Sequence, residues 1–117
     1  MVIMTYYMNL WDDSFQAIKA GWKTIEMRLN DEKRSIISVG DTIEFTNTTT
    51  QEKISCQVVN IYKYANFADL SKHHNKVSIG YKEDETANSD DMLLYYTRED
   101  IEKYGVVGIG ISVTAQV

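Results

Sequence analysis

The feature of this sequence that most constrains its fold is an alternation of apolar and polar residues that returns in several segments. It occurs at residues 24–29, 42–46, 54–62 and 107–113. A period of two puts the apolar side chains on one face of an extended chain, so each segment predicts a β-strand with one buried face. Residues 1–10, rich in β-branched, aromatic and methionine side chains, predict a first strand that is buried over much of its surface.

One clear helix interrupts this β-rich pattern. The apolar residues of its buried face recur at steps of four, three and four: Trp11, Phe15, Ile18 and Trp22. Residues 12–14 offer N-cap candidates, and Gly21 suits the left-handed position that follows a helix. Short helical patterns are also present at residues 68–73 and 92–96, and residues 97–100 have the spacing of a capping box.

Five or six short strands with two or three helices predict an α+β domain. We expect a small mixed or antiparallel sheet curled into a barrel, because a flat sheet would leave its edges exposed. Residues 1–117 are predicted to form a single domain, since 44% hydrophobic and 25% charged residues are ordinary for one globular unit. A Rossmann fold is not expected, because strands do not alternate regularly with long helices and residues 105–110 lack the GxGxxG spacing.

The net charge of −5 limits the possible partners. General nucleic-acid binders need a basic surface, so broad binding driven by charge, including binding in a DNA groove, is not expected. A local cationic pocket is compatible with the net charge, because charges are screened over about 8 to 10 Å. The single cysteine, Cys56, fits a reducing compartment, and no apolar run approaches the ~20 residues of a membrane helix. A cytoplasmic protein without membrane contact is therefore expected.

The candidate functional segment is residues 21–28, where a helix end, a glycine turn and a strand meet. Glu26 and Arg28 share one face of the strand, and the long stem of Lys23 can reach the same face. A guanidinium grips phosphate with two bonds, an ammonium acts as a point charge, and a carboxylate accepts N–H bonds. The segment therefore suits recognition of anionic and hydrogen-bonding groups, although the pattern alone also fits a solvated strand edge with an exposed ion pair.

This segment and the turn after it resemble the signature of the ASCH domain family: Gly21-x-Lys23-x-x-Glu26-x-Arg28, followed by Gly40-Asp41. The resemblance extends through residues 42–62 and 95–113, so it covers most of the chain. It implies a PUA-like β-barrel in which the motif lines a cleft for RNA or a modified nucleoside or nucleotide. Lys23, Glu26 and Arg28 are then cleft residues, whereas the glycines of the signature are turn residues.

Two neighbours complete the predicted ligand-binding set. Thr24 offers a hydroxyl beside Lys23, and Trp22 is the aromatic residue expected to stack on a base, with Tyr81 and Tyr96 behind it. Trp22 also completes the apolar face of the helix, so its position has a purely structural explanation as well.

The resemblance also implies an enzymatic alternative. One branch of the family resembles small amidohydrolases that deacylate N4-acetylcytidine with a lysine, a threonine and a carboxylate, in a K-T-x-T motif. Glu26 stands at the position of that branch's nucleophilic threonine, so Lys23 and Glu26 are tentative catalytic residues that position a water and stabilise an oxyanion. The third acid falls within residues 79–91, where Glu83 or Glu85 is the candidate, although this stretch also has the composition of a solvated acidic loop.

No metal site and no cofactor are expected. His73 and His74 are adjacent and cannot converge on one helix face, and Cys56 alternates with apolar strand residues as a buried, inert thiol does. A third class of function is a protein-interaction module, in which the acidic surface contacts a basic partner and residues 21–28 only support the fold.

Overall fold

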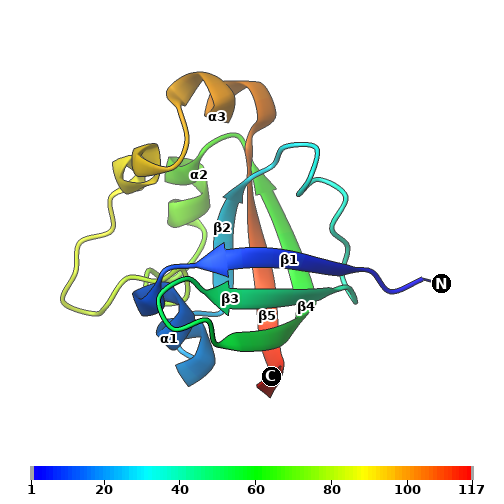
Figure 1. The fold of residues 1–117 in the computed structure, drawn as a ribbon. Helices are drawn as coiled ribbons and strands as arrows, with labels where there is room; N and C mark the ends of the chain where they lie inside the picture. Colours follow the sequence, from blue (N-terminus) through cyan, green and yellow to red (C-terminus); the bar gives the residue numbers. More distant parts are fainter. Residues whose placement is uncertain (1, 117) are drawn as a thin grey trace.

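The computed structural model of the chain describes residues 2–116, which fold around a mixed sheet (Figure 1). Within these residues the sheet has five strands in the order β1-β3-β4-β5-β2: β1 (Thr5–Leu10), β2 (Ile25–Leu29), β3 (Thr42–Asn47), β4 (Lys53–Tyr64) and β5 (Val106–Gln116). β1 pairs with β3 in parallel, and the other neighbours pair antiparallel. The predicted α+β class is confirmed, and the sheet curls into a half-barrel with β1 and β2 at its edges.

The helices of the described residues are α1 (Asp12–Ala20), α2 (Phe67–Lys72), α3 (Arg98–Tyr104) and a 3-10 helix, η1 (Ser89–Leu94). The predicted first helix is confirmed as α1, and Gly21 follows it in the left-handed conformation with φ of +89°. Of its predicted apolar face, Phe15 and Ile18 are buried, whereas Trp11 and Trp22 lie just outside the helix and are exposed. The prediction of an N-cap within residues 12–14 is wrong. β1 runs directly into the helix, so that Trp11 occupies the N-cap position and makes no side-chain capping bond.

The short helices of the second half of the chain agree with their predicted positions. α3 begins at the predicted capping residue, since the Thr97 hydroxyl accepts a hydrogen bond from the Asp100 N–H at 3.1 Å. The Asn88 side chain caps η1 in the same way, through the Asp90 N–H at 3.0 Å. None of the helices in residues 2–116 is long and apolar enough to cross a membrane.

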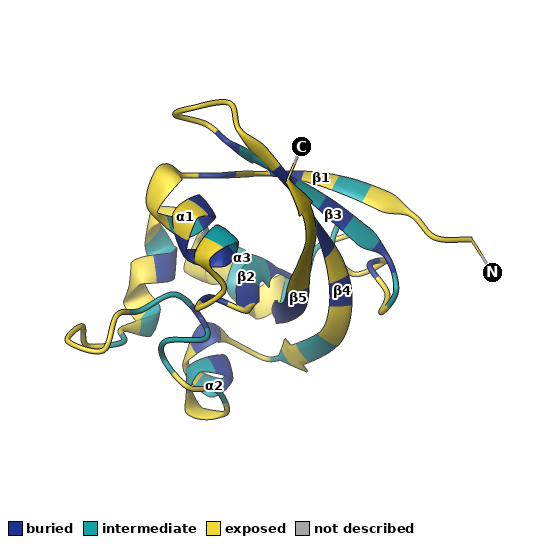
Figure 2. Ribbon diagram, turned by 90° about the horizontal axis from the view of Figure 1, so that it is seen from below, coloured by how far each residue is buried: buried dark blue, intermediate teal, exposed yellow. Residues whose placement is uncertain are grey.

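Two predictions about strand burial are wrong, and the position of each strand in the sheet explains why. β1 is an edge strand, so Met8 and Leu10 are buried while Tyr7, on its other face, is 74% exposed. β5 lies between β4 and β2, and side chains cover both of its faces, so every residue from 106 to 111 is buried rather than one face alone. Figure 2 shows β5 changing from buried to exposed toward the C-terminus.

The core has one hydrophobic cluster on each face of the sheet. α1 contributes Phe15 and Ile18 to the first cluster, which contains Val107, and α2 contributes Phe67 and Leu70 to the second, which contains its neighbour Val106. Because successive residues of β5 point to opposite clusters, the strand anchors both α1 and the second half of the chain.

The two edges of the half-barrel meet at a seam. Arg28 of β2 donates a hydrogen bond through Nη2 to the backbone carbonyl of Asn9 in β1, at 2.9 Å. The loop after α2 is tied to the start of β2, because the N–H groups of Thr24 and Ile25 both donate to the Ser78 carbonyl at 2.9 Å. The seam, the start of α1 and this loop therefore surround a common space.

Candidate functional site

A cleft of about 360 Å³ occupies the space beside the seam. The charged triad of Lys23, Glu26 and Arg28 forms part of its wall, together with Ser14 from α1. The segment from residue 79 to residue 96 closes the opposite side. The cleft is thus assembled from the consecutive elements β1, α1 and β2 and from η1, which is far from them in the sequence.

Short hydrogen bonds join the three side chains of the charged triad. Lys23 Nζ lies 2.9 Å from Glu26 Oε1, while Arg28 Nε and Nη2 lie 3.0 Å and 2.7 Å from Glu26 Oε2. The side chains of Lys23 and Glu26 are 7% and 6% exposed, and that of Arg28 is 15% exposed. The structure therefore brings together the three residues that the sequence singled out, with little of their side-chain surface exposed.

The triad holds its central carboxylate in the ionised form. Burial acts to raise the pKa of Glu26, but the charges of Lys23 and Arg28 and their hydrogen bonds outweigh it, so the pKa falls from 4.5 to about 2. Burial acts to lower the pKa of Arg28, and the negative charge of Glu26 raises it above its ordinary value. Glu26 is accordingly a fixed hydrogen-bond acceptor and a weak proton acceptor.

Lys23 is held in place from two further sides. Its Nζ donates to Ser14 Oγ at 3.3 Å, which ties the segment between α1 and β2 back to α1. Gly80 lies against its stem, since a Cβ added there would be 3.2 Å from Lys23 Cδ, and the φ of Gly80 is +112°. Glycine thus allows both the backbone conformation and the close approach of the loop.

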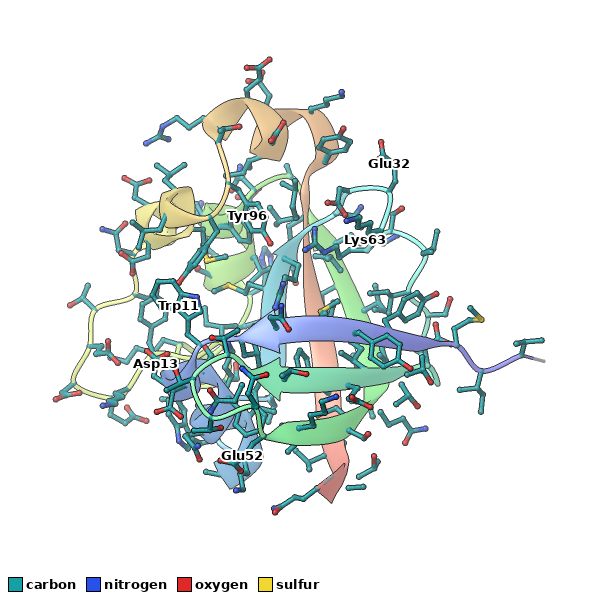
Figure 3. All side chains as sticks on the ribbon, in the orientation of Figure 1. Trp11, Asp13, Glu32, Glu52, Lys63 and Tyr96 are labelled. Atoms are coloured by element: carbon teal, nitrogen blue, oxygen red, sulfur yellow. The ribbon has the colours of Figure 1, made fainter. Side chains whose placement is uncertain are left out.

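Aromatic side chains form the rim of the cleft. Trp11 is 65% exposed and Tyr95 is 54% exposed, and their rings meet edge to face with centroids 6.0 Å apart. Tyr81 and Tyr96 line the cleft from less exposed positions. Figure 3 shows Trp11 and Tyr96 on the same side of the molecule, between β1 and the yellow 3-10 helix. The rim therefore offers flat apolar surfaces above a polar wall.

Three carboxylates lie at the exposed part of the cleft: Asp13, Glu85 and Asp91. Asp91 accepts a hydrogen bond from the Tyr81 hydroxyl at 2.8 Å. Burial and this hydrogen bond raise the pKa of Tyr81 to about 12. The opening of the cleft is consequently acidic, whereas its wall is of mixed charge.

Some of the predicted residues lie elsewhere. Thr24 is exposed and precedes β2, and neither Thr24 nor Trp22 lines the cleft. Of the two candidate acids, Glu85 lines the cleft and Glu83 does not. Two-residue alternation would place Thr24 on the face of Glu26, but β2 begins only at Ile25, so the alternation does not extend to Thr24.

Trp11, Ser14 and Tyr95 also line the cleft, although no pattern in the sequence predicted them there. Trp11 and Ser14 belong to the predicted helix, where apolar spacing and capping already explained them. The available signal was the break between strand and helix at Trp11, because side chains at such junctions often face a site built on the strand ends.

The remaining candidates are structural. Cys56 is fully buried as predicted, and burial raises the pKa of its thiol to about 12. His74 Nε2 is 2.9 Å from the Tyr64 hydroxyl, and the His73 ring stacks on Tyr64. Within residues 2–116, no group of three or more His, Cys, Asp or Glu side chains lies close enough to hold a metal ion.

Fold and cleft together define a PUA-like α+β domain, and a family model gives the identification. The model of the ASCH domain matches residues 8–114, so the chain belongs to the ASCH domain family. No curated protein matches the chain significantly.

Solved structures with the same fold include two small proteins of similar length. The hypothetical protein PH0355 is 30% identical, with a TM-score of 0.80, and the match covers 95% of this chain and 100% of that one. Protein PF0455 from Pyrococcus furiosus is 29% identical, with a TM-score of 0.72 and coverages of 94% and 97%. The ZmASCH S128A mutant protein from Zymomonas mobilis, at 13% identity, a TM-score of 0.61 and coverages of 97% and 72%, shares the fold alone.

Proposed function

We propose that this chain binds a nucleotide-containing ligand, an RNA element or a modified nucleoside, by taking its base into the cleft beside Lys23, Glu26 and Arg28. The observation that carries the proposal is the charged triad, buried in the wall of a cleft with an aromatic rim. Removing three charges from water is costly, and an apolar core of the same volume is often at least as stable. Buried charges that line a cleft are therefore candidates for recognition.

The triad has hydrogen-bonding capacity left for a ligand. Glu26 Oε1 accepts from Lys23, which leaves it one further lone pair, and the Arg28 guanidinium, which interacts with Glu26 and with Tyr96, has five N–H donors in all. A carboxylate acceptor next to a guanidinium donor matches the paired donor and acceptor atoms on the edge of a nucleobase. One wall of the cleft can therefore form hydrogen bonds to the edge of a nucleobase.

The rim supplies the second requirement for base binding. Exposed Trp11 and Tyr95 present ring surfaces at the opening, and base–aromatic stacking contributes about 1–3 kcal/mol per base. A volume of about 360 Å³ falls in the range of small-ligand sites. These features favour a base or nucleoside over a larger group.

The amidohydrolase alternative has weaker support in this geometry. Both oxygens of Glu26 are hydrogen-bonded and its pKa is about 2, so it is a poor general base. Ser14 Oγ is the hydroxyl beside Lys23 in the cleft, but the Lys23 ammonium donates to it instead of accepting its proton. We propose binding without hydrolysis, and incubation with N4-acetylcytidine tests this directly: release of acetate above the buffer rate would restore the enzymatic alternative.

Calorimetric titration with the four ribonucleosides and short single-stranded RNAs tests the proposed binding. We expect at least one saturable ligand, and Arg28→Lys, which keeps the charge but loses the planar fork, weakens it by about 10-fold. Arg98→Lys is the matched control, because the Arg98 side chain is 75% exposed on α3 and does not line the cleft. Absence of binding to every ligand, or equal affinities of the two variants, would contradict the proposal.

We also propose a cytoplasmic location, which the free thiol of Cys56 suits.

A further inference from the structure

A second groove, of about 490 Å³, runs along the free edge of β1. Residues of β1 form one wall, and the segment that follows β2 forms the other. The polar side chains that line the groove include Tyr7, Asn9, Arg28, Lys33 and Arg34. Asn9 and Arg28 line both this groove and the cleft. The two hollows are therefore continuous across the seam, with the Arg28 guanidinium between them.

The two hollows have opposite charge. The ionisable residues that line the cleft are Asp13, Glu26, Glu85 and Asp91 against Lys23 and Arg28, a formal balance of two negative charges. The groove is lined by Arg28, Lys33 and Arg34, with no carboxylate among its lining residues. The contrast is large for a chain whose net charge is −5.

The neighbouring acids reduce the positive charge of the groove only in part. Arg34 Nη1 lies 2.6 Å from Asp31 Oδ2, so its charge is largely balanced within the loop. Glu32 projects from the outer side of the loop, away from β1 (Figure 3). Lys33 is exposed and takes part in none of the ion pairs found within residues 2–116. Arg28 is paired with Glu26, but Glu26 is shared with Lys23, so these three side chains keep one net positive charge. That charge and Lys33 give the groove its attraction for an anion.

We propose that the groove holds the phosphodiester backbone of a single-stranded RNA whose base occupies the cleft. This inference rests on the proposed function and specifies its ligand as a strand instead of a free nucleotide. The acids at the opening of the cleft repel a phosphate, so an uncharged base enters there while the phosphate next to it lies across the seam, near Arg28 and Lys33. A positively charged track beside a base-sized cleft is the arrangement that single-stranded nucleic acids require.

Tyr7 adds a place for a second base. Its side chain is 74% exposed and lines the groove, on the face of β1 that also carries Asn9. A base adjacent to the one in the cleft stacks on this ring while the intervening phosphate faces Lys33. The groove is therefore expected to extend recognition by one nucleotide.

The experiment compares the four ribonucleosides with the corresponding homotrinucleotides in calorimetric titrations of the whole chain. The trinucleotide of the preferred base binds more tightly than its nucleoside, and its advantage shrinks between about 50 and 200 mM salt, because contacts to phosphate release counterions. Lys33→Ala weakens the trinucleotide by about 5-fold, as expected for one exposed charge pair, and leaves the nucleoside unchanged. Lys72→Ala is the control, since Lys72 is 74% exposed on α2 and lies outside both hollows.

The outcomes separate this inference from the proposed function. Saturable nucleoside binding with no gain for the trinucleotide, or no difference between Lys33→Ala and Lys72→Ala, overturns the groove and leaves the cleft proposal standing. No response to any nucleoside or trinucleotide overturns both. A glutamate-rich peptide of matched charge that binds as tightly as the trinucleotide would also overturn the groove inference, since the groove would then select charge alone.

Discussion

Two lysine–glutamate pairs in this chain have the same length and different surroundings. Lys23 and Glu26 lie 2.9 Å apart in the wall of the cleft, where their side chains are 7% and 6% exposed. Lys19 and Glu52 also lie 2.9 Å apart, on the surface beside α1, where they are 31% and 43% exposed. Distance alone would therefore assign them the same importance.

The environment decides what each pair does. Water and salt screen the surface pair, so it contributes little to stability and its loss leaves both charges solvated. Water cannot solvate the charges of the cleft pair in this way. If one partner is removed, the charge of the other stays buried without an opposite charge beside it. The candidate site is therefore defined by the burial of its charges, and the pairing is the consequence.

The largest expected effect comes from removing the shared carboxylate charge of the cleft. Glu26→Gln keeps the shape of the side chain but leaves Lys23 and Arg28 as two buried cations, and we expect a loss of about 3–5 kcal/mol in the free energy of unfolding. Urea denaturation followed by circular dichroism measures it. Glu52→Gln is the matched surface control and should barely move the midpoint; equal losses in the two variants would remove the distinction between the pairs.

The stabilising contribution of the Glu26 charge should also depend on pH. The folded pKa of Glu26 is about 2, below its ordinary value of 4.5, so its stabilising contribution is complete above pH 4.5 and is lost as the pH falls toward 2. The difference between these pKa values corresponds to about 3 kcal/mol. The free energy of unfolding, measured by urea denaturation from pH 6 to pH 2, should therefore fall by roughly that amount more for the wild type than for Glu26→Gln. Parallel curves for the two proteins would contradict the lowered pKa of Glu26.

A smaller effect is expected from crowding Lys23. Gly80→Ala places a methyl group 3.2 Å from Lys23 Cδ at a φ of +112°, whereas Gly40→Ala places one in open space at a φ of +98°. Both substitutions cost about 1–2 kcal/mol through backbone strain, but we expect only Gly80→Ala to displace the Lys23 ammonium and weaken ligand binding. Equal ligand affinities in the two alanine variants would show that the loop does not position Lys23.

The smallest effect is expected at Ser14, whose hydroxyl accepts a hydrogen bond from Lys23 at 3.3 Å. Ser14→Ala should lower the unfolding free energy by about 0.5 kcal/mol, because Lys23 keeps its bond to Glu26. Calorimetric unfolding of the variant measures this. A loss as large as that of Glu26→Gln would show that the hydroxyl, rather than the carboxylate, secures the lysine.

Much of the fold could be predicted from local pattern. Alternation located β2 and β3, and the Gly21 and Thr97 signals located one end each of α1 and α3. What local pattern could not give is which strand lies at the edge. β1 was predicted as buried and β5 as buried on one face, because a sequence shows the apolarity of a strand and not how many neighbours it has.

The site was predictable to the extent that it is local. Lys23, Glu26 and Arg28 lie within six residues, so a strand pattern and a family signature were enough to group them. The aromatic rim comes from the start of α1 and from η1, and no spacing in the sequence relates Trp11 to Tyr95. Trp22 was chosen because it is next to Lys23, but it lies beyond the end of α1 and does not line the cleft.

The most direct test of the account is a ¹H–¹⁵N spectrum of the indole groups of Trp11 and Trp22, the two tryptophans of the chain. Trp22→Phe assigns the two signals, and the four ribonucleosides are then titrated in turn. We predict that a binding nucleoside shifts the Trp11 signal saturably and leaves Trp22 in place, because Trp11 stands at the cleft and Trp22 outside it. A ligand that shifts the Trp22 signal while that of Trp11 stays fixed would contradict the placement of the ligand in this cleft.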